Sequence, residues 1–222
     1  MHLNSELIFR KHGVPFFKDQ DKILEIGPAG SPSEYQKVVN NPKIVWHTID
    51  FADTTFINSS TDNLTYKLTS PYKFPVEDKT YDIVLSGQVI EHVEKIWEWL
   101  KEIKRVTKDD GLIVTVNPVS WPYHEAPIDC WRIYPNGIIA LAEEVGLDVV
   151  FCKTESLEIE NLQKLDKKIK YIPGRSYNYT EANSTIERKI SWNKFVRKLP
   201  FFRTFEIPIE VAFDTISVLR KK

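Results

Sequence analysis

The fold is decided by the stretch Lys22-Ile23-Leu24-Glu25-Ile26-Gly27-Pro28-Ala29-Gly30-Ser31-Pro32. A short apolar run passes at once into a turn that holds two glycines. The run Ser31-Pro32-Ser33-Glu34 then has the pattern of a helix start, with Ser31 as N-cap and Pro32 at the first helical position. Strand, glycine turn and helix in this order open a Rossmann-like sheet, and the turn is where the backbone can approach a ligand closely.

The chain on either side of this stretch alternates apolar strand patterns with helix patterns. Apolar residues recur at three- and four-residue spacing between positions 90 and 103, and Gly146 follows a second such pattern as a C-cap. Asp109-Asp110-Gly111 is expected to form a turn. The alternation predicts a parallel α/β sheet. Strands are expected at 23–26, 43–50, 65–68, 81–86, 112–116, 147–152 and 214–219, and helices at 5–20, after Ser31 as far as Asn40, at 90–103 and at 138–145.

Composition narrows the class of protein. A chain of 222 residues with 42% hydrophobic residues predicts one compact domain, and a net charge of −1 gives no reason to expect nucleic acid binding. Cys130 and Cys152 form neither a disulfide framework nor a metal cluster, no signal peptide is visible, and no apolar run is long enough to span a bilayer, so a cytoplasmic protein is expected.

Residues 155–222 carry 14 Lys and Arg against 9 Asp and Glu, which indicates a solvated basic surface or a docking face for an anionic substrate or membrane.

Three loops are expected to meet beyond the carboxyl ends of the strands, where open α/β sheets bind ligands. The first is the turn from Gly27 to Gly30. The second carries Asp50, which ends its strand 20 residues after Gly30 and can accept hydrogen bonds from both hydroxyls of a ribose. The third is Ser86-Gly87-Gln88 at the end of the fourth strand.

The first loop favours S-adenosylmethionine (SAM) over a nicotinamide cofactor. A dinucleotide diphosphate needs backbone N–H groups at the start of the helix, but Pro28 and Pro32 lack that donor and the G-x-G-x-x-G spacing is missing. SAM has no phosphate, and its sulfonium and amine are positively charged. An acid such as Glu25 beside the loop suits those positive groups.

From residue 20 to residue 154 the chain resembles the class I SAM-dependent methyltransferases. Leu24–Pro28 resembles their first motif, and the run from Tyr81 to Val93 resembles their fourth strand with its Glu-His-Val element. Ala29 and Ser31 stand where the usual second and third glycines would be, and Ser70 stands near the position of an adenine-binding acid. By this resemblance Glu25, Gly27 and Gly30 line the methionine side, Asp50 holds the ribose, and Ser86 and Gln88 flank the sulfonium. The full set expected at the cofactor is Glu25, Gly27, Pro28, Gly30, Asp50, Phe51, Ser70, Ser86, Gly87 and Gln88.

The resemblance also implies an architecture. We expect an α/β Rossmann-like three-layer sandwich, with a mostly parallel seven-stranded sheet whose last strand is antiparallel. The whole chain, 1–222, then forms one domain, in which 155–213 is an insertion before the last strand. Its aromatic residues suit a lid that stacks on a glycan, a helical cover that buries its own small core, or a homodimer interface.

The segment from Asn117 to Arg132 follows the fifth strand and is expected to hold the methyl acceptor. It is similar to a His-to-Asp-x-Trp-Arg segment of methyltransferases that accompany glycan and nucleotide-sugar genes. His124 is the expected general base, and Asp129 is expected to orient His124 or to act as the base itself. Each of these residues also has a plain structural interpretation, as loop packing or as an Asp129–Arg132 ion pair. Acceptor-binding residues are expected to be Tyr123, Trp131 and Arg132.

These patterns together predict SAM-dependent methyl transfer to an oxygen of a sugar, glycan or other small polar acceptor. Two alternatives remain: N-methyl transfer to an amino sugar or small amine, and a non-catalytic binding module that keeps the sheet. No metal is expected, because no acids cluster at metal-ligand spacing. Glu91 and His92 are interpreted as structural or cofactor-side residues.

Overall fold

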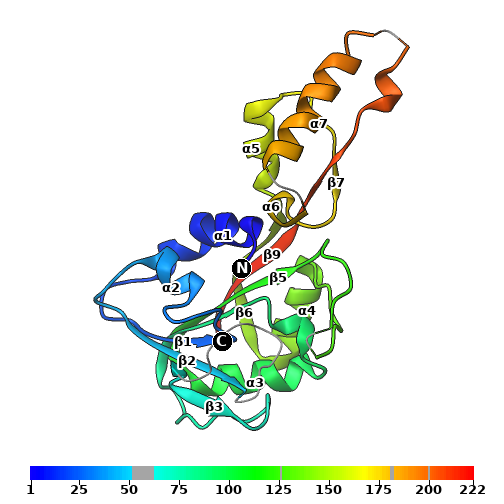
Figure 1. The fold of residues 1–222 in the computed structure, drawn as a ribbon. Helices are drawn as coiled ribbons and strands as arrows, with labels where there is room; N and C mark the ends of the chain where they lie inside the picture. The colour runs from blue at the N-terminus through cyan, green and yellow to red at the C-terminus, as the bar shows by residue number, and fades with distance from the viewer. Residues whose placement is uncertain (52–62, 126, 181–182, 200) are drawn as a thin grey trace.

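A computed structural model of the chain describes residues 1–51, 63–125, 127–180, 183–199 and 201–222. Its centre is a seven-stranded sheet in the order β3-β2-β1-β4-β5-β9-β6 (Figure 1). The strands β1 to β5 run parallel, and β9 runs antiparallel to both β5 and β6. This arrangement confirms the predicted fold class. The strands are β1 (Lys22–Ile26), β2 (Val45–Phe51), β3 (Tyr66–Leu68), β4 (Tyr81–Gly87), β5 (Thr107–Pro118), β6 (Leu147–Glu155) and β9 (Asp214–Lys221).

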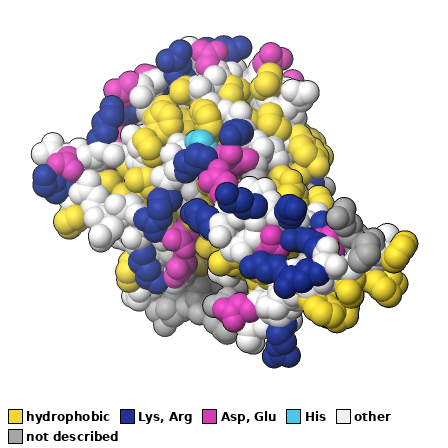
Figure 2. All heavy atoms as spheres, turned by 90° about the horizontal axis from the view of Figure 1, so that it is seen from above, with side chains coloured by type: hydrophobic (Ala, Val, Ile, Leu, Met, Phe, Trp, Pro, Cys, Tyr) yellow, Lys and Arg dark blue, Asp and Glu magenta, His cyan; other side chains and the backbone are white. Residues whose placement is uncertain are grey.

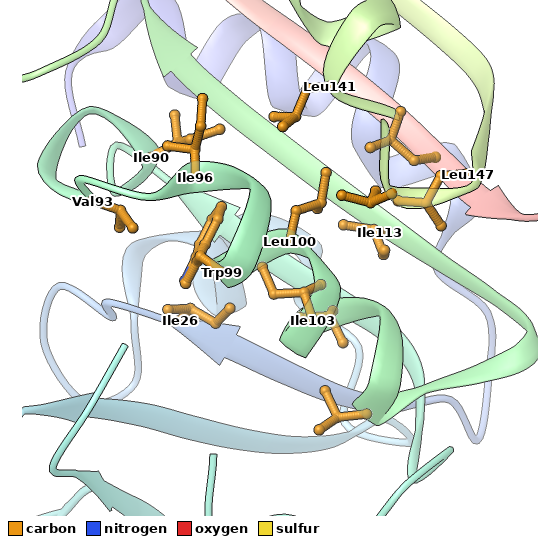
Figure 3. Packing of buried hydrophobic residues seen from close by; sticks show 14 of the residues in the cluster. Ile26, Ile90, Val93, Ile96, Trp99, Leu100, Ile103, Ile113, Leu141 and Leu147 are labelled. Atoms are coloured by element: carbon orange, nitrogen blue, oxygen red, sulfur yellow. The ribbon is translucent and has the colours of Figure 1, made fainter. Parts of the chain in front are cut away.

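Two helical layers cover the sheet because successive side chains of each buried strand point to opposite faces. Ile23 of β1 belongs to one hydrophobic cluster and its neighbour Leu24 to the other. The cluster with Leu24 packs under α3 (Ile96–Val106) and α4 (Pro135–Val145), and Figure 3 shows Trp99, Leu100 and Ile103 of α3 pointing into it. The cluster with Ile23 lies under the other layer. That layer consists of α1 (Leu3–Ile8), a π-helical turn (Phe9–Gly13), a 3-10 turn (Val14–Phe16) and α2 (Glu34–Val39).

Two local predictions are wrong, and both concern turn residues. The N-cap of α2 is Ser33 and not Ser31: the backbone N–H of Gln36 donates to Ser33 Oγ over 3.0 Å. Asp109-Asp110-Gly111 does not end a helix in a turn but lies inside β5. The pairing of β4 with β5 jumps from Tyr81–Thr107 to Ile83–Leu112, so these residues form an irregularity within the strand.

The helix predicted between 90 and 103 divides into two pieces, a 3-10 turn (Ile90–His92) and α3. The break leaves Glu91 and His92 at the end of β4 and not along a helix face. The C-cap prediction at Gly146 is confirmed, since this glycine has φ +71° and its N–H closes the last turn of α4.

The insertion forms a lobe that projects from one end of the sheet (Figure 1). It has a small hydrophobic core of its own, and Arg197 crosses it to pair with Asp166 and Glu206. This agrees with the expectation of a cover that buries its own residues; the lid and dimer roles stay predictions. The lobe contains α5 (Glu158–Leu165), β7 (Tyr171–Pro173), α6 (Tyr177–Thr180), α7 (Asn183–Val196), a 3-10 turn (Arg203–Phe205) and β8 (Ile209–Val211).

Viewed from the side on which the lobe projects, basic and hydrophobic side chains lie next to one another on the surface (Figure 2). Phe201 is 89% exposed, and Trp192, Phe195 and Phe205 are also exposed.

Across the described ranges of the chain, no helix is both long and apolar enough to cross a membrane.

Candidate functional site

The parallel register brings the three predicted loops to one edge of the sheet. Ile26, the last residue of β1, pairs with Ile49 of β2 on one side and with Ser86 of β4 on the other. The N–H of Gly27 also donates to the carbonyl of Ile49 over 3.0 Å. Asp50, Gly27 and Gly87 therefore lie in this order across the neighbouring tips of β2, β1 and β4.

At two of the three glycines at this edge, Gly27 and Gly87, a side chain would collide with neighbouring residues. Gly27 has φ +67°, and a Cβ there would lie 2.5 Å from Val89 Cγ2. A Cβ on Gly87 would overlap the ring of Tyr35. Gly30 differs, because its φ is +87° but a Cβ would meet nothing nearer than the carbonyl of Pro32 at 3.6 Å. Close packing against Val89 and Tyr35 therefore requires glycine at these two positions, and their backbone carries no side chain of its own.

Asp50 lies at the tip of β2 with its side chain partly buried. Its Oδ1 accepts a hydrogen bond of 2.7 Å from the backbone N–H of Phe51, and burial raises the pKa of the carboxyl. Phe51 itself is 37% exposed. Ser70, predicted near an adenine, accepts a hydrogen bond from the backbone of Tyr72 through Oγ. The contacts of these three residues with a cofactor stay predictions.

Glu25 is buried inside the chain at the end of β1. Its carboxylate accepts hydrogen bonds from the hydroxyl of Ser33 and from Trp46 Nε1, and it thereby joins β1 to the start of α2 and to β2. Burial raises its pKa to about 7, against the opposing effect of the two hydrogen bonds. Its predicted contact with the methionine side of a cofactor has not been tested.

The raised pKa of Glu25 predicts a pH-dependent stability. Because the folded chain keeps a proton that the unfolded chain releases above pH 4.5, the free energy of unfolding falls as pH rises from about 4.5 through 7. A shift of this size costs about 3 kcal/mol once the carboxyl has ionised. Glu25→Gln stays neutral, so its stability relative to wild type is expected to rise from pH 5 to pH 8 in urea unfolding. The exposed Glu34→Gln is the control, and a pH-independent difference for Glu25→Gln would refute the assignment.

Two features at this edge were missed by sequence reasoning. The first is α1, which packs against the strand tips: Gln88 Nε2 donates to Ser5 Oγ over 3.0 Å, and Asn4 Nδ2 donates to Asp214 Oδ2 over 2.7 Å. Gln88 also reaches Asp214 Oδ1 at 3.3 Å. Gln88, which is predicted to flank the sulfonium, is therefore held in place by α1.

The second missed feature is Tyr35 of α2. Its ring fills the space beside Gly87, and its hydroxyl is buried without a hydrogen-bond partner among the described residues. Burial, together with the nearby carboxylates of Asp214, Glu25 and Glu91, raises its pKa far above the ordinary value. A buried hydroxyl that lacks a partner is costly, and a polar ligand in the cradle would supply one. Nothing in the sequence pattern distinguishes Tyr35 from a core tyrosine.

The remaining predicted cofactor residues are also at this edge. Pro28 is buried in the turn after β1, and Ser86 is buried in β4 between Ile26 and Thr115 of the adjacent strands. The structure thus gathers the loop residues that the sequence singled out. Their contacts with a cofactor stay predictions.

The predicted acceptor segment lines an open hollow of about 260 Å³. Two indole rings, a phenol and three polar or charged groups surround it, which suits a ligand with both a ring and polar substituents. Tyr123 stands at its mouth, 71% exposed. The lining residues are Trp121, Tyr123, Asp129, Cys130, Trp131 and Arg132.

Asp129 and Arg132 form the ion pair that the sequence left open as an alternative. The guanidinium donates to both carboxylate oxygens, over 2.5 and 2.7 Å, and its other N–H groups donate to backbone carbonyls including that of Trp121. Burial opposes ionisation of Asp129, but these hydrogen bonds and that of the His124 N–H lower its pKa to about 2. A carboxylate with so low a pKa is a weak base. Asp129 therefore fits the role of orienting His124 better than the role of general base.

His124 stands beside this pair, next to residues that line the hollow. Its Nδ1 lies 3.1 Å from the carbonyl of Pro122 and 3.4 Å from Asp129 Oδ2. Its ring meets that of His92 edge to face, with centroids 5.0 Å apart. Trp131 turns its Nε1 away to the carbonyl of Val93, at 2.8 Å. His124 is therefore held by the loop but keeps an exposed edge, as a proton acceptor needs.

Comparison with known sequences gives a partial match to one family. Residues 35–115 match the family described as "Methyltransferase domain", which is less than half of the chain. An uncharacterized methyltransferase of Schizosaccharomyces pombe is 30% identical over an alignment of 113 residues, and the match covers 45% of this chain. The matched segment spans only 41% of that relative's length.

Comparison with solved structures shows the fold along nearly the whole chain. A SAM-dependent methyltransferase from Archaeoglobus fulgidus aligns with a TM-score of 0.54 and 18% identity, covering 96% of this chain and 92% of the other. Phosphoethanolamine N-methyltransferase 2 of Haemonchus contortus aligns at 0.52 and 13%, covering 98% and 52%. The [4+2]-cyclase SpnF aligns at 0.54 and 13%, covering 98% and 79%. Identities this low establish a shared fold and leave the chemistry to the site.

Proposed function

We propose that this chain, whose fold is that of the class I SAM-dependent methyltransferases, binds SAM at the carboxyl edge of its sheet and transfers the methyl group to an oxygen of a small polar or carbohydrate acceptor. One observation carries the proposal. The bare backbone at Gly27 and the carboxylate of Asp50 lie on neighbouring strand tips, joined by the hydrogen bond from Gly27 N to Ile49 O.

The residues present fit SAM. Asp50 offers an acceptor for ribose hydroxyls, and the glycine backbone at Gly27 allows close approach. The hydroxyl of Tyr35, packed against Gly87, is buried without a hydrogen-bond partner among the described residues. The acids around it, Glu25 and Glu91, make the surroundings suited to a positively charged group. When bound, SAM supplies an electrophilic methyl group, whose bond to sulfur breaks with the electron pair left on sulfur as the acceptor oxygen bonds to carbon.

The acceptor is proposed to enter the hollow lined by the loop from Trp121 to Arg132. Indole and phenol faces stack on the apolar faces of sugar rings, and the rigid ion pair of Asp129 with Arg132 keeps the loop in place. His124 then receives the proton of the acceptor hydroxyl while Asp129, 3.4 Å away, stabilises the imidazolium. The loop's own residues thereby bind the acceptor, orient it and move its proton.

Two other functions are compatible with the fold. The Haemonchus neighbour is named as an N-methyltransferase, and an amine acceptor needs only to arrive neutral, without a base. The neighbour named as a cyclase has the same fold without a methyltransferase name, so the fold alone does not require methyl transfer, and a non-catalytic binding module is the second alternative. A labelled-methyl transfer screen over sugars, nucleotide sugars, glycans and small amines separates the three. Transfer to amines alone would overturn the oxygen assignment, and SAM binding without any transfer would favour a non-catalytic module.

His124→Gln is expected to reduce kcat by about 10²-fold or more, because removing a positioned general base costs that much. SAM affinity should stay within about twofold of wild type, since the cradle lies on other loops. His12→Gln is the matched control, because His12 pairs with Glu155 outside the hollow. Equal turnover by the two variants would remove His124 from the reaction.

A further inference from the structure

Glu91 is a buried carboxyl to which the proposed reaction gives no direct contact with the acceptor and no proton to transfer. It lies on the 3-10 turn that follows β4 and is 0% exposed. Both of its side-chain oxygens lack a hydrogen-bond partner among the described residues. Buried polar groups are nearly always paired, so two orphaned oxygens on one carboxyl call for a missing partner.

His92 presents a nitrogen to this carboxyl. Its Nδ1 lies 2.5 Å from the carbonyl of Ile128, so Nδ1 carries the proton and donates it there. This fixes the tautomer and leaves Nε2 with its lone pair, 3.8 Å from Glu91 Oε1. Metal-binding histidines are oriented in this way, by a backbone carbonyl or carboxylate at the other ring nitrogen.

His124 completes the group from the opposite side, on the acceptor loop. Its Nδ1 is near the carbonyl of Pro122, and Asp129 Oδ2 stands behind it, so the second ring nitrogen is the one left for another partner. One ligand atom from each of Glu91, His92 and His124 lies within 4.8 Å of the others. Two segments about 30 residues apart in the sequence thus bring two imidazoles and a carboxylate together.

We propose that Glu91, His92 and His124 bind one divalent transition-metal cation. Two imidazoles with one carboxylate form the three-ligand set that holds Zn²⁺ with a fourth position open, and imidazole also suits iron, nickel and copper. Ligands at about 2.0–2.2 Å from Zn²⁺ lie closer together than these atoms do, so the group must contract on binding. His124 is the ligand that can move most easily, because its side chain is 35% exposed.

The inference rests on the proposed function and changes one step of it. A cation with an open position would bind the acceptor hydroxyl and lower its pKa, so that its proton can leave to solvent. His124 would then act as a ligand and not as the base. The hollow is adjacent, since Asp129 both lines it and contacts His124. The sequence predicts no metal because it has no clustered acids, and three ligands that the fold assembles from separate segments leave no such pattern.

The test is a calorimetric titration of the full chain, freed of metal by chelation, with Zn²⁺ alone. Wild type is expected to bind one equivalent, and Glu91→Gln and His124→Gln each to bind at least about 100-fold more weakly. Asp129→Asn, which alters the support of His124, should lose about 10-fold or more. Cobalt(II) in place of zinc should give a visible absorption band in wild type that both ligand variants lose.

Two controls keep the result decisive. Glu25→Gln removes an equally buried carboxyl elsewhere, and His12→Gln removes a histidine outside the group; both should bind Zn²⁺ as wild type does. Should Glu91→Gln fail to fold, His124→Gln, at a partly exposed position, decides alone. Absence of stoichiometric binding, or equal binding by wild type and His124→Gln, would overturn the inference. SAM binding is titrated separately, so a wild-type chain that binds SAM but no Zn²⁺ would refute the metal site and leave the proposed function intact.

Discussion

Asp50→Ala is expected to weaken SAM binding by about 100-fold or more. Asp50 ends β2 beside the bare turn at Gly27, and its carboxylate is the group placed to accept both ribose hydroxyls. Two hydrogen bonds to a charged group contribute about 1.5–3 kcal/mol each, and 1.4 kcal/mol corresponds to a factor of ten in affinity. Isothermal titration with SAM and with S-adenosylhomocysteine measures the change.

Asp110→Asn is the matched control for Asp50→Ala. It also removes one negative charge, but Asp110 is exposed and lies near the start of β5, at the opposite edge of the sheet. Its SAM affinity should equal that of wild type. If the two variants bind SAM equally well, Asp50 does not hold the ribose and the site must lie elsewhere.

Gly27→Ala is expected to have the second large effect, on both stability and SAM binding. The residue has φ +67°, which strains any side chain, and the added methyl would stand 2.5 Å from Val89 Cγ2. Strain and overpacking of this kind cost about 1–3 kcal/mol each. We expect a fall of about 3 kcal/mol in the free energy of unfolding and at least a tenfold loss of SAM affinity.

Gly30→Ala separates backbone strain from the clash with Val89 as causes of the lost stability. Its φ of +87° is equally unfavourable for alanine, but the methyl would meet the carbonyl of Pro32 only at 3.6 Å. The variant should therefore show the backbone strain without the clash, and lose no more than about 1–2 kcal/mol. A Gly27→Ala variant as stable as Gly30→Ala would mean that the turn can relax away from Val89.

The sheet could be predicted because each strand carries its own signal. The apolar run before Gly27, the run from Tyr81 to Ser86 and the helix pattern ending at Gly146 are local patterns, and the structure has all three elements. The helix start at Ser31 and the turn at Gly111 were misplaced. In both, the residue types permit a cap or a turn, but packing decided which serine caps α2 and allowed β5 to continue through an irregularity.

The candidate site could be predicted only in part. Gly27, Asp50 and Gly87 end adjacent strands, so topology alone places them together. Tyr35, α1 and the Glu91–His92–His124 group could not be foreseen, because their positions depend on long-range packing between segments with ordinary local patterns. Composition singled out the loop that we propose to bind the acceptor, but the Asp129–Arg132 ion pair that fixes this loop was one of two open alternatives.

The most direct test of this account is a crystal structure of the chain with S-adenosylhomocysteine. We expect the adenosyl group across the tips of β1 and β2, with its ribose hydroxyls on the carboxylate of Asp50 and its amino acid end over the backbone of Gly27. Ligand density away from these two residues, or a complex in which packed side chains fill the space between them, would contradict the proposal.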